Sequence, residues 1–487
     1  MALRNAELQR LRKHRVPAWW RDAKLGIFVH WTIASIPAFA PVDVDIGELV
    51  QAGTRDALKY CPYAEWYENS LGFPDSPVAE HHRAVYGSRP YTDFAAEWEA
   101  GLEQWDPNEW AARFAATGAR YVVFVTKHMD GYCLWPTGVP NPNRPGWNCS
   151  RDVVGELGEA VRGAGMRFGL YYSGGLDSTF NNRPIGSVAQ MMDAIPRGDY
   201  PAYADAQVRE LIDRYRPSVL WNDIAWPSEG KQLWPLFSYY YQQVPDGVVN
   251  DRWMPWSALL ATMRSSTARR GLDALIQRQA KRDSGVIPPR PPHFDVRTPE
   301  YVVFDDVQPR PWECVRGMDQ SFGHNEQSRP EHFLPHDELL WMLTDITAKG
   351  GNLLLNVGPR GADAQIPDAQ LTRLSWLADW VVPHAGAIAA TRPWIVPGTT
   401  TGEGAPLRYT ARDDTVYAFV QGGSGSVTLP DVRSTPTTTV TAIDGAALPW
   451  KDAPHGMAVD VPSAADPAQP AVLALRQVEA RTTAPAR

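Results

Sequence analysis

The chain has 487 residues, with 55 acidic and 47 basic side chains and a formal net charge of −8. This length suits two or three domains, or one large barrel with a smaller module. With 44% hydrophobic residues the chain can bury a full core, which excludes global disorder. The mild acidity argues against a nucleic-acid partner, because phosphates are recognised by basic surfaces. No apolar run reaches the roughly 20 residues that span a bilayer, so no membrane partner is expected.

The N-terminal residues carry charges without the apolar stretch of a signal peptide, so a cytoplasmic location is expected. The four cysteines are scattered and form no CxxC pair, so neither a zinc ribbon nor a disulfide framework is predicted. Tryptophan is unusually abundant, with 20 residues against 18 Tyr and 14 Phe. Such an excess either fills a large core or packs against sugar rings, and composition leaves both readings open.

Apolar strand-like runs alternate with amphipathic helices over most of the chain. The predicted strands are 25–29, 121–125, 168–172, 219–221, 248–249 and 353–355, and the predicted helices are 107–118, 153–164, 204–215, 233–243 and 338–349. Strands that are apolar on both faces and alternate with helices indicate a parallel sheet covered by helices. The length and the number of repeats favour a (β/α)8-like, TIM-type barrel of the α/β class over a doubly wound sheet. Neither a GxGxxG nor a GxxxxGK[ST] loop is present.

The pattern changes after about residue 390. Short strand-like runs are separated by turn residues with no helix between them, at 415–420, 426–429, 437–443, 457–461 and 471–478. They predict a small antiparallel β-sandwich. The predicted domains are therefore a catalytic barrel over 1–390 and a sandwich over 391–487.

Residues 256–292 form an insertion in the predicted barrel, with a basic helical part followed by a proline-rich extended part. The insertion is interpreted either as a solvated excursion or as a lid or subunit contact in a homo-oligomer.

Polar side chains follow several of the predicted strands. His30, His128, Tyr171, Asp223 and Arg252 each stand at or just after a strand end. Catalytic groups of such barrels lie at the C-terminal ends of the strands, so these residues predict a polar pocket at one mouth. Hydrogen-bond donors, carboxylates and aromatic walls together suit a sugar ring.

Glycoside hydrolysis normally uses two carboxylates. Asp223 directly follows an apolar strand and is therefore held rigidly, although an aspartate in this place can also be a helix N-cap. Its partner is less defined by pattern, because Glu65, Glu300 and Glu313 all lie beside aromatic residues or proline in loop-like sequence.

The rival chemistries have weaker signals. There is no HxH or HExxH motif, and His30 and His128 are far apart in the chain, so no metal site is predicted. No GxSxG elbow indicates a serine hydrolase.

A set of motifs extends across roughly residues 17–395. They are WRDAKLGIFVHW (20–31), AEWYENSL (64–71), TKHMDGYCLW (126–135), GLYYSGGLD (169–177), VLWND (219–223), VNDRW (249–253), TPEY (298–301), SFGHN (321–325) and KGGNLLLNVGPRG (349–361). In type and order they resemble the motifs of glycoside hydrolase family 29, the α-L-fucosidases. The sandwich after the barrel also fits that family.

The resemblance implies an exo-acting, retaining α-L-fucosidase that needs no metal and no cofactor and acts on fucosylated oligosaccharides or glycosides. By motif position, Asp223 would be the nucleophile that forms a covalent glycosyl-enzyme. Glu300 would be the general acid/base, with Glu65 and Glu313 as alternatives. The positions that would line the fucose pocket are His30, Glu65, Trp66, His128, Tyr171, Trp221, Arg252 and Phe322.

In this assignment the polar residues would bond the sugar hydroxyls, while Trp66 and Phe322 would pack on the ring and its C5 methyl group. The two carboxyl groups of a retaining pair are expected about 5–5.5 Å apart. We further expect Arg252 to lie nearer to Asp223 or the sugar than to Glu300.

One departure bears on specificity. The family commonly has two adjacent histidines where this chain has His128-Met129, and a thioether cannot donate a hydrogen bond to a hydroxyl. A related sugar such as an α-L-galactoside is therefore an alternative substrate. A non-catalytic carbohydrate-binding protein on a hydrolase scaffold is a further alternative.

Overall fold

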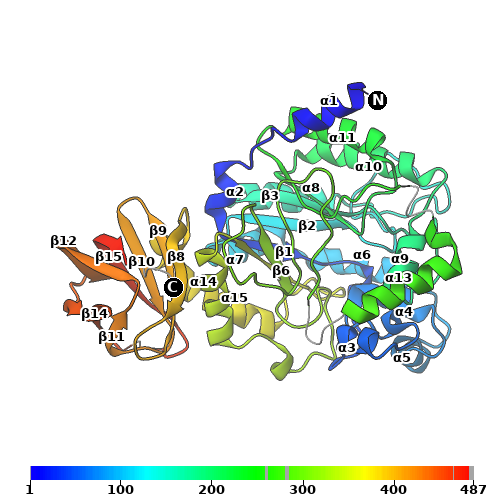
Figure 1. Cartoon of the computed structure of the whole chain (residues 1–487). Coiled ribbons are helices and arrows are strands. Elements are labelled where there is room, and N and C mark those ends of the chain that lie inside the picture. The colour runs from blue at the N-terminus through cyan, green and yellow to red at the C-terminus, as the bar shows by residue number, and fades with distance from the viewer. Residues whose placement is uncertain (1, 258–261, 280–284, 464–465, 482–487) are drawn as a thin grey trace.

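The computed structural model describes residues 2–257, 262–279, 285–463 and 466–481. Figure 1 shows a large α/β part, followed at the C-terminal end of the chain by a smaller part made of strands. Residues 258–261 and 280–284 of the predicted insertion lie outside the described residues, as do 464–465 and 482–487 of the predicted sandwich.

The α/β part is built on a seven-stranded parallel sheet in the order β5-β4-β3-β2-β1-β7-β6. The strands are β1 Leu25–Val29, β2 Tyr121–Lys127, β3 Arg167–Ser173, β4 Val219–Asp223, β5 Val248–Val249, β6 Glu313–Gly317 and β7 Asn352–Val357. Nearly every strand residue is buried, because helices cover the outside and side chains fill the inside.

The segment 295–301 closes this sheet into a ring. On one side the amides of Asp295 and Val296 donate to the Val249 carbonyl of β5, at 3.0 and 3.3 Å. On the other side the Tyr301 amide donates to the Val315 carbonyl of β6, and the Val315 amide to the Pro299 carbonyl, both at 2.9 Å. The predicted TIM-type barrel is confirmed, and the closing segment is the one that carries Glu300.

Helices surround the ring (Figure 1). The larger ones are α7 Pro107–Ala116, α8 Val153–Gly163, α10 Tyr200–Tyr215, α11 Gly230–Gln243, α14 His336–Ala348 and α15 Asp368–Val381. The others are α1 Ala2–Leu11, α2 Ala18–Ala23, α3 Ile46–Gln51, α4 Tyr67–Leu71, α5 Pro77–Tyr86, α6 Phe94–Gly101, α9 Val188–Ala194, α13 Ser266–Gln279 and α16 Ala385–Ile388. Helices α3 to α6 lie where no element was predicted. None of the helices in the described ranges is both long and apolar enough to cross a membrane.

Most tryptophans fill the core. The fully buried ones are Trp20, Trp31, Trp98, Trp135, Trp226, Trp253, Trp312 and Trp380. Inside the barrel, a β-carbon added at Gly26 of β1 would lie 2.4 Å from the Tyr121 ring, so this glycine leaves the space that the ring occupies. The high tryptophan content is therefore explained largely by packing.

The C-terminal part consists of two antiparallel sheets, in the orders β12-β15-β10-β9-β8 and β11-β14-β13. The strands are β8 Arg392–Thr400, β9 Pro406–Arg412, β10 Thr415–Val420, β11 Gly425–Leu429, β12 Val432–Ala442, β13 Trp450–Ala453, β14 Gly456–Val461 and β15 Ala471–Ala480. The sandwich class is confirmed, but β8, β9 and β13 were not predicted. β8 contains two prolines, which a strand tolerates at the edge of a sheet.

Contacts join the two parts. Phe419 of β10 packs with the barrel core beside Trp380 of α15. Arg408 of β9 forms an ion pair with Asp345 of α14.

The predicted helix of the insertion exists as α13. Its Arg269 pairs with Asp193 of α9 at 2.9 Å, and its Asp273 accepts a hydrogen bond from Ser187 Oγ at 3.0 Å. This helix is therefore attached to the barrel rather than surrounded by solvent.

Candidate active site

The polar residues predicted at the strand ends lie together at one mouth of the barrel. The rings of His30 and His128 are 6.0 Å apart, and His128 stacks on Tyr171 at 5.7 Å. The Tyr171 hydroxyl donates to Asp223 Oδ2 at 3.0 Å, and Asp223 is paired with Arg252. A continuous chain of contacts thus connects five side chains at or near the C-terminal ends of β1 to β5.

Arg252 joins the two candidate catalytic carboxylates. Its Nη1 lies 3.1 Å from Asp223 Oδ1, and its Nη2 lies 2.9 Å from Glu300 Oε2. The expectation that Arg252 lies nearer to Asp223 than to Glu300 is wrong, because the forked guanidinium reaches both carboxylates at once. The three side chains are only 10–16% exposed, so the ion pairs are shielded from water.

Asp223 is held by three donors. Besides Tyr171 and Arg252, the amide of Ile224 donates to Oδ1 at 2.9 Å. Together these donors fix the position of both carboxylate oxygens. The N-cap alternative is wrong, because the next helix, α11, begins at Gly230 and is capped by Glu229.

Glu300 is held from two sides. The Tyr63 hydroxyl donates to its Oε1 at 2.9 Å, opposite the contact with Arg252. Its backbone is also paired in both directions with Val286 of the insertion, with N–O distances of 2.9 and 2.7 Å. We call residues 285–288 the strap. A β-carbon at Gly285 would lie 2.0 Å from the Glu300 carbonyl oxygen, so the strap can approach this closely only with glycine there.

Backbone strain follows both carboxylates. Ile224 and Ala225 have φ angles of 54° and 66°, and Tyr301 has a φ angle of 55°. Side chains with a β-carbon disfavour this left-handed region, and a β-branched residue disfavours it most. Strain of this kind persists only where surrounding contacts enforce it, and it is typical of functional sites.

His30 and His128 are neutral at ordinary pH. Burial, together with the nearby His128, lowers the pKa of His30 to about 3, and burial lowers the pKa of His128 to about 3. His30 Nδ1 contacts Asn356 Oδ1 at 2.6 Å. His128 Nδ1 is buried and has no hydrogen-bond partner within the described residues. An imidazole with a free nitrogen suits a sugar hydroxyl.

Glu65 and Trp66 belong to a short 3-10 helix, Ala64–Trp66. Glu65 Oε2 accepts a hydrogen bond from the Gly323 amide at 2.7 Å. Burial raises the pKa of Glu65 to about 8, so this group is protonated at neutral pH. Trp66 packs in one apolar cluster with Met129, which places the departure from the family's double histidine next to a predicted pocket wall.

Glu313 lies elsewhere. It is the first residue of β6, fully buried inside the barrel, and its oxygens accept hydrogen bonds from Tyr121 at 2.7 Å and Trp221 at 3.1 Å. Burial raises its pKa to about 7. Both oxygens are occupied by barrel residues, so this carboxyl group holds the Trp221 ring in place. On geometry it is a poorer proton donor to a substrate than Glu300.

Aromatic side chains complete the pocket. Trp221 stacks on Tyr171 at 5.4 Å and lies 4.8 Å from the Arg252 guanidinium carbon. Phe322 lies 5.1 Å from the His30 ring and 5.4 Å from the Tyr63 ring. These rings offer the apolar surface that the C–H face of a sugar requires.

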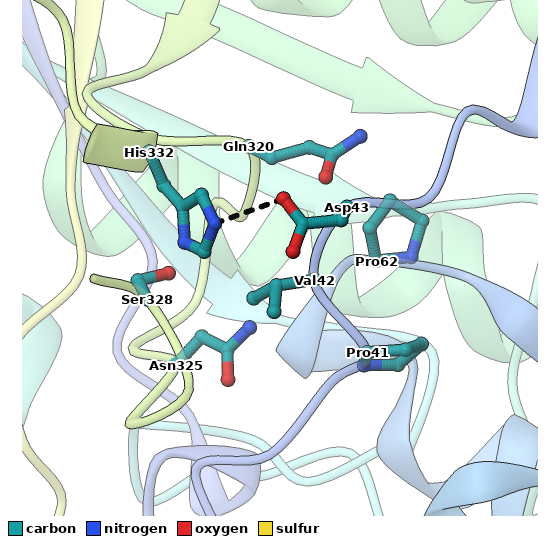
Figure 2. A pocket seen from close by; sticks show the side chains of 8 residues that line it. All are labelled: Pro41, Val42, Asp43, Pro62, Gln320, Asn325, Ser328 and His332. Atoms are coloured by element: carbon teal, nitrogen blue, oxygen red, sulfur yellow. Dashed lines mark hydrogen bonds and ion pairs between the residues drawn. The ribbon is translucent and has the colours of Figure 1, made fainter. Parts of the chain in front are cut away.

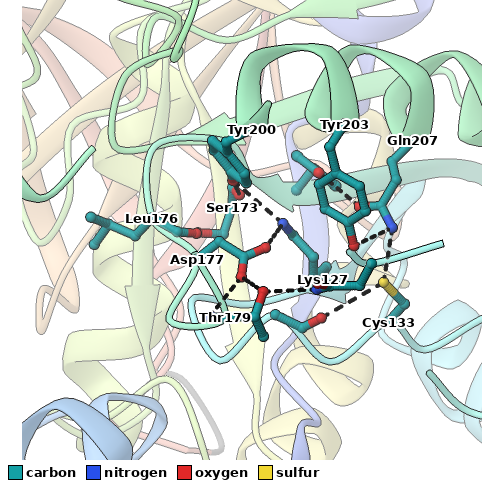
Figure 3. Close-up of polar contacts among 12 residues, drawn as sticks. Lys127, Cys133, Ser173, Leu176, Asp177, Thr179, Tyr200, Tyr203 and Gln207 are labelled. Carbon is teal, nitrogen blue, oxygen red and sulfur yellow. Dashed lines mark hydrogen bonds and ion pairs between the residues drawn. The ribbon is translucent and has the colours of Figure 1, made fainter. Parts of the chain in front are cut away.

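A buried ion pair fixes the end of β2 just before His128. Lys127 Nζ lies 2.6 Å from Asp177 Oδ2, and both side chains are completely buried. Figure 3 shows this pair among its neighbours. Thr179 donates to the other oxygen of Asp177, and the Tyr172 ring lies 4.4 Å from the ammonium group. A buried charge pair costs desolvation, and it needs such full satisfaction to persist. The pair gives His128 a rigid base.

A separate cavity of about 240 Å³ lies near the site (Figure 2). Its lining includes Pro62 and Gln320. Pro62 directly precedes Tyr63 in the sequence, and Gln320 is close in sequence to Phe322 of the pocket. Two of its lining residues, Asp43 and His332, contact each other at 3.0 Å, and the dashed line in Figure 2 marks this contact.

Three contributing residues were not predicted. Tyr63 bonds Glu300, Asn356 bonds His30, and Asp251 Oδ1 accepts hydrogen bonds from the amide and hydroxyl of Thr298, at 3.0 and 2.7 Å. Asn356 and Asp251 lie inside the motifs quoted above, so membership of those motifs is the sequence signal that indicates them. Within the described ranges, no group of three or more His, Cys, Asp or Glu side chains is arranged to hold a metal ion.

Comparisons with known proteins agree with this geometry. The family model described as alpha-L-fucosidase matches residues 3–385. The alpha-L-fucosidase of Branchiostoma floridae is 30% identical, covering 92% of this chain and 89% of the relative, and the human tissue alpha-L-fucosidase is 27% identical, covering 94% and 88%. The crystal structure of Thermotoga maritima alpha-fucosidase with a mechanism-based inhibitor superposes with a TM-score of 0.79 at 36% identity, covering 96% and 98% of the two chains. The chain therefore belongs to the α-L-fucosidase family of glycoside hydrolases.

Proposed function

We propose that this protein is an exo-acting, retaining α-L-fucosidase that releases terminal α-L-fucosyl residues through a covalent glycosyl-enzyme. The observation that carries the proposal is the single guanidinium of Arg252, which holds Asp223 and Glu300 toward the same pocket. Two carboxylates facing one ring are the requirement of the double-displacement mechanism. The names of the relatives support fucose as the sugar.

In the proposed mechanism Asp223 attacks the anomeric carbon while Glu300 gives its proton to the departing glycosidic oxygen. A water molecule then attacks the same carbon, Glu300 takes its proton, and the bond to Asp223 breaks. Arg252 stabilises the negative charge that passes from Asp223 to Glu300 during the first step. Tyr63 and the strap hold Glu300 in line with the leaving group.

The pocket side chains have distinct proposed tasks. The imidazole of His128 and the protonated Glu65 bond sugar hydroxyls. Trp66 and Phe322 cover the apolar edge of the ring, including the methyl group. The cavity of Figure 2 receives the next part of the glycan, since it adjoins Tyr63 and therefore the proton donor that it contacts.

The variant Asp223→Ala tests the proposal. Hydrolysis of an aryl α-L-fucoside should fall by at least about 10³-fold, because the attacking group is lost. Sodium azide should restore part of the aryl-group release and yield β-L-fucosyl azide, identified by NMR, since the small anion fills the vacated space. The control Asp213→Ala, which removes a carboxylate from the outer face of α10, should keep wild-type activity. Undiminished turnover in Asp223→Ala would remove this residue from the mechanism.

The alternative substrate, an α-L-galactoside, is tested at Met129. Met129 joins an apolar cluster with Trp66 and offers no donor to a hydroxyl. On a panel of aryl glycosides, Met129→His should raise kcat/KM for the fucoside about tenfold, the value of one added hydrogen bond. If wild-type protein prefers the galactoside and Met129→His reverses that preference, the second substrate is correct. An unchanged preference would assign no role to Met129.

A further inference from the structure

Arginines gather around a second cavity at the other end of the barrel. The cavity has a volume of about 620 Å³, and its basic lining consists of Arg12, Arg15, Arg21, Arg290 and Arg310. Arg21 and Arg310 precede the first residues of β1 and β6, whereas the candidate active site lies at the opposite ends of the strands. The cavity is therefore separate from the fucose pocket.

In the described ranges these arginines are not paired with carboxylates. Within the part of the chain that the structure describes, none of the five forms an ion pair: Arg12 donates only to the Pro292 carbonyl at 3.5 Å, and Arg310 stacks on Phe294 at 4.8 Å. Asp295, the carboxylate among the described lining residues, is already engaged, with Oδ1 bound to His14 and Oδ2 to the Tyr241 hydroxyl and an amide.

The lining is also stiff. Arg290 is followed by Pro291 and Pro292, and Arg310 lies between Pro309 and Pro311. Proline fixes its own φ angle and restricts the preceding residue, so the backbone at Arg290 and Arg310 is held in a limited set of conformations. All five side chains are exposed, so water screens their mutual repulsion, and an anion in the hollow is attracted by all of them at once.

We propose that this cavity binds a small anion that carries two or more phosphate groups. Guanidinium groups recognise phosphate oxygens in pairs, and five of them call for more than one phosphate. The cavity is larger than a single phosphate needs. It is also a compact hollow rather than the extended surface of 1,000–2,500 Å² that a specific DNA complex buries. The ligand is therefore a small molecule rather than a nucleic acid.

Isothermal titration calorimetry with sodium triphosphate at 100 mM NaCl tests this inference. The wild-type chain should bind one triphosphate, and the double variant Arg290→Gln/Arg310→Gln should bind it at least about tenfold more weakly. The control Arg270→Gln/Arg278→Gln changes the net charge equally at two exposed arginines of α13 that also lack ion pairs in the described residues, and it should bind like wild type. Sodium sulfate, titrated in parallel, should bind more weakly than triphosphate.

Three results would overturn the proposal. They are no binding by the wild type at millimolar triphosphate, equal weakening in both double variants, or tighter binding of a short DNA duplex that the Arg290→Gln/Arg310→Gln variant loses. The second would assign the effect to overall charge, and the third would replace the small anion by nucleic acid. Circular dichroism spectra of all variants show that the fold is kept. Because the readout is binding, its failure leaves the proposed fucosidase activity untouched.

Discussion

The two ends of the barrel differ in how their charged side chains are paired. At the catalytic mouth one guanidinium serves two carboxylates, and Tyr63 and Tyr171 satisfy their remaining oxygens. At the other end five guanidinium groups surround a cavity whose single described carboxylate is already occupied. At the mouth the protein itself supplies a donor to every carboxylate oxygen, whereas the arginine-lined cavity is completed by a ligand.

This contrast separates two kinds of site. An internally balanced site is preorganised, so that it stabilises charge as it moves during a reaction without rearrangement. A site with unmatched charge gains its energy from binding an ion of opposite sign. Removing a cation should thus damage turnover at the first end and affinity at the second.

The largest effect is expected where the balance depends on one residue. Arg252→Met leaves two carboxylates facing each other in a buried pocket, and kcat for an aryl α-L-fucoside should fall about 10²–10³-fold. Initial rates at saturating substrate measure this. The control Arg151→Met, which breaks a half-exposed ion pair with Glu156, should stay within twofold of wild type. Activity near the wild-type level in Arg252→Met would show that catalysis does not depend on the pairing of the two carboxylates through Arg252.

An intermediate effect is expected at the strap. Gly285→Ala places a methyl group against the Glu300 carbonyl and should displace the carboxyl group, lowering kcat about tenfold with little change in KM. Gly271→Ala on α13 is a matched control, because a β-carbon there meets nothing within 4 Å. Equal kinetics in the two variants would show that the strap does not position Glu300.

The smallest effect concerns Glu65. This buried carboxyl group is protonated and neutral instead of forming an ion pair. Its pKa rises from 4.5 to about 8 through burial, so the folded state holds a proton that the unfolded chain releases. This contribution to stability is complete below about pH 4.5 and is lost as pH rises toward 8. Between pH 5 and pH 8 the free energy of unfolding of the wild type should therefore fall by about 2–4 kcal/mol more than that of Glu65→Gln.

Thermal unfolding at the two pH values measures that difference. An exposed carboxylate on α5 supplies the control, since Glu80→Gln should follow the wild-type curve. A Glu65→Gln curve parallel to wild type would mean that Glu65 is ionised in the fold and needs a counter-charge of its own.

Much of the barrel could be predicted because the spacing of apolar residues indicates which strand and helix faces are buried. The run 121–125 is apolar on both faces, and β2 spans it. Helices α3 to α6 escaped prediction because they are short and owe their form to packing rather than to a long amphipathic repeat. β8 escaped because its prolines break the strand signal, and they are tolerated only because it is an edge.

For the site, strand-end residues could be predicted because the fold fixes where strands end. The dual contact of Arg252 could not, since it depends on the closing segment 295–301 and on the forked geometry of one side chain. Tyr63 and the strap reach Glu300 from other loops, and no local pattern records such long-range contacts.

The left-handed backbone at Ala225, two residues after Asp223, has a consequence for engineering. Glycine there would relieve the unfavourable torsion at the cost of one methyl group, and such a variant would tolerate a higher temperature. The same relaxation would let the Asp223 carboxylate move away from the position that catalysis requires. Selection for heat resistance alone would therefore collect a change beside Asp223 that slows the enzyme, and a screen has to score survival and turnover together.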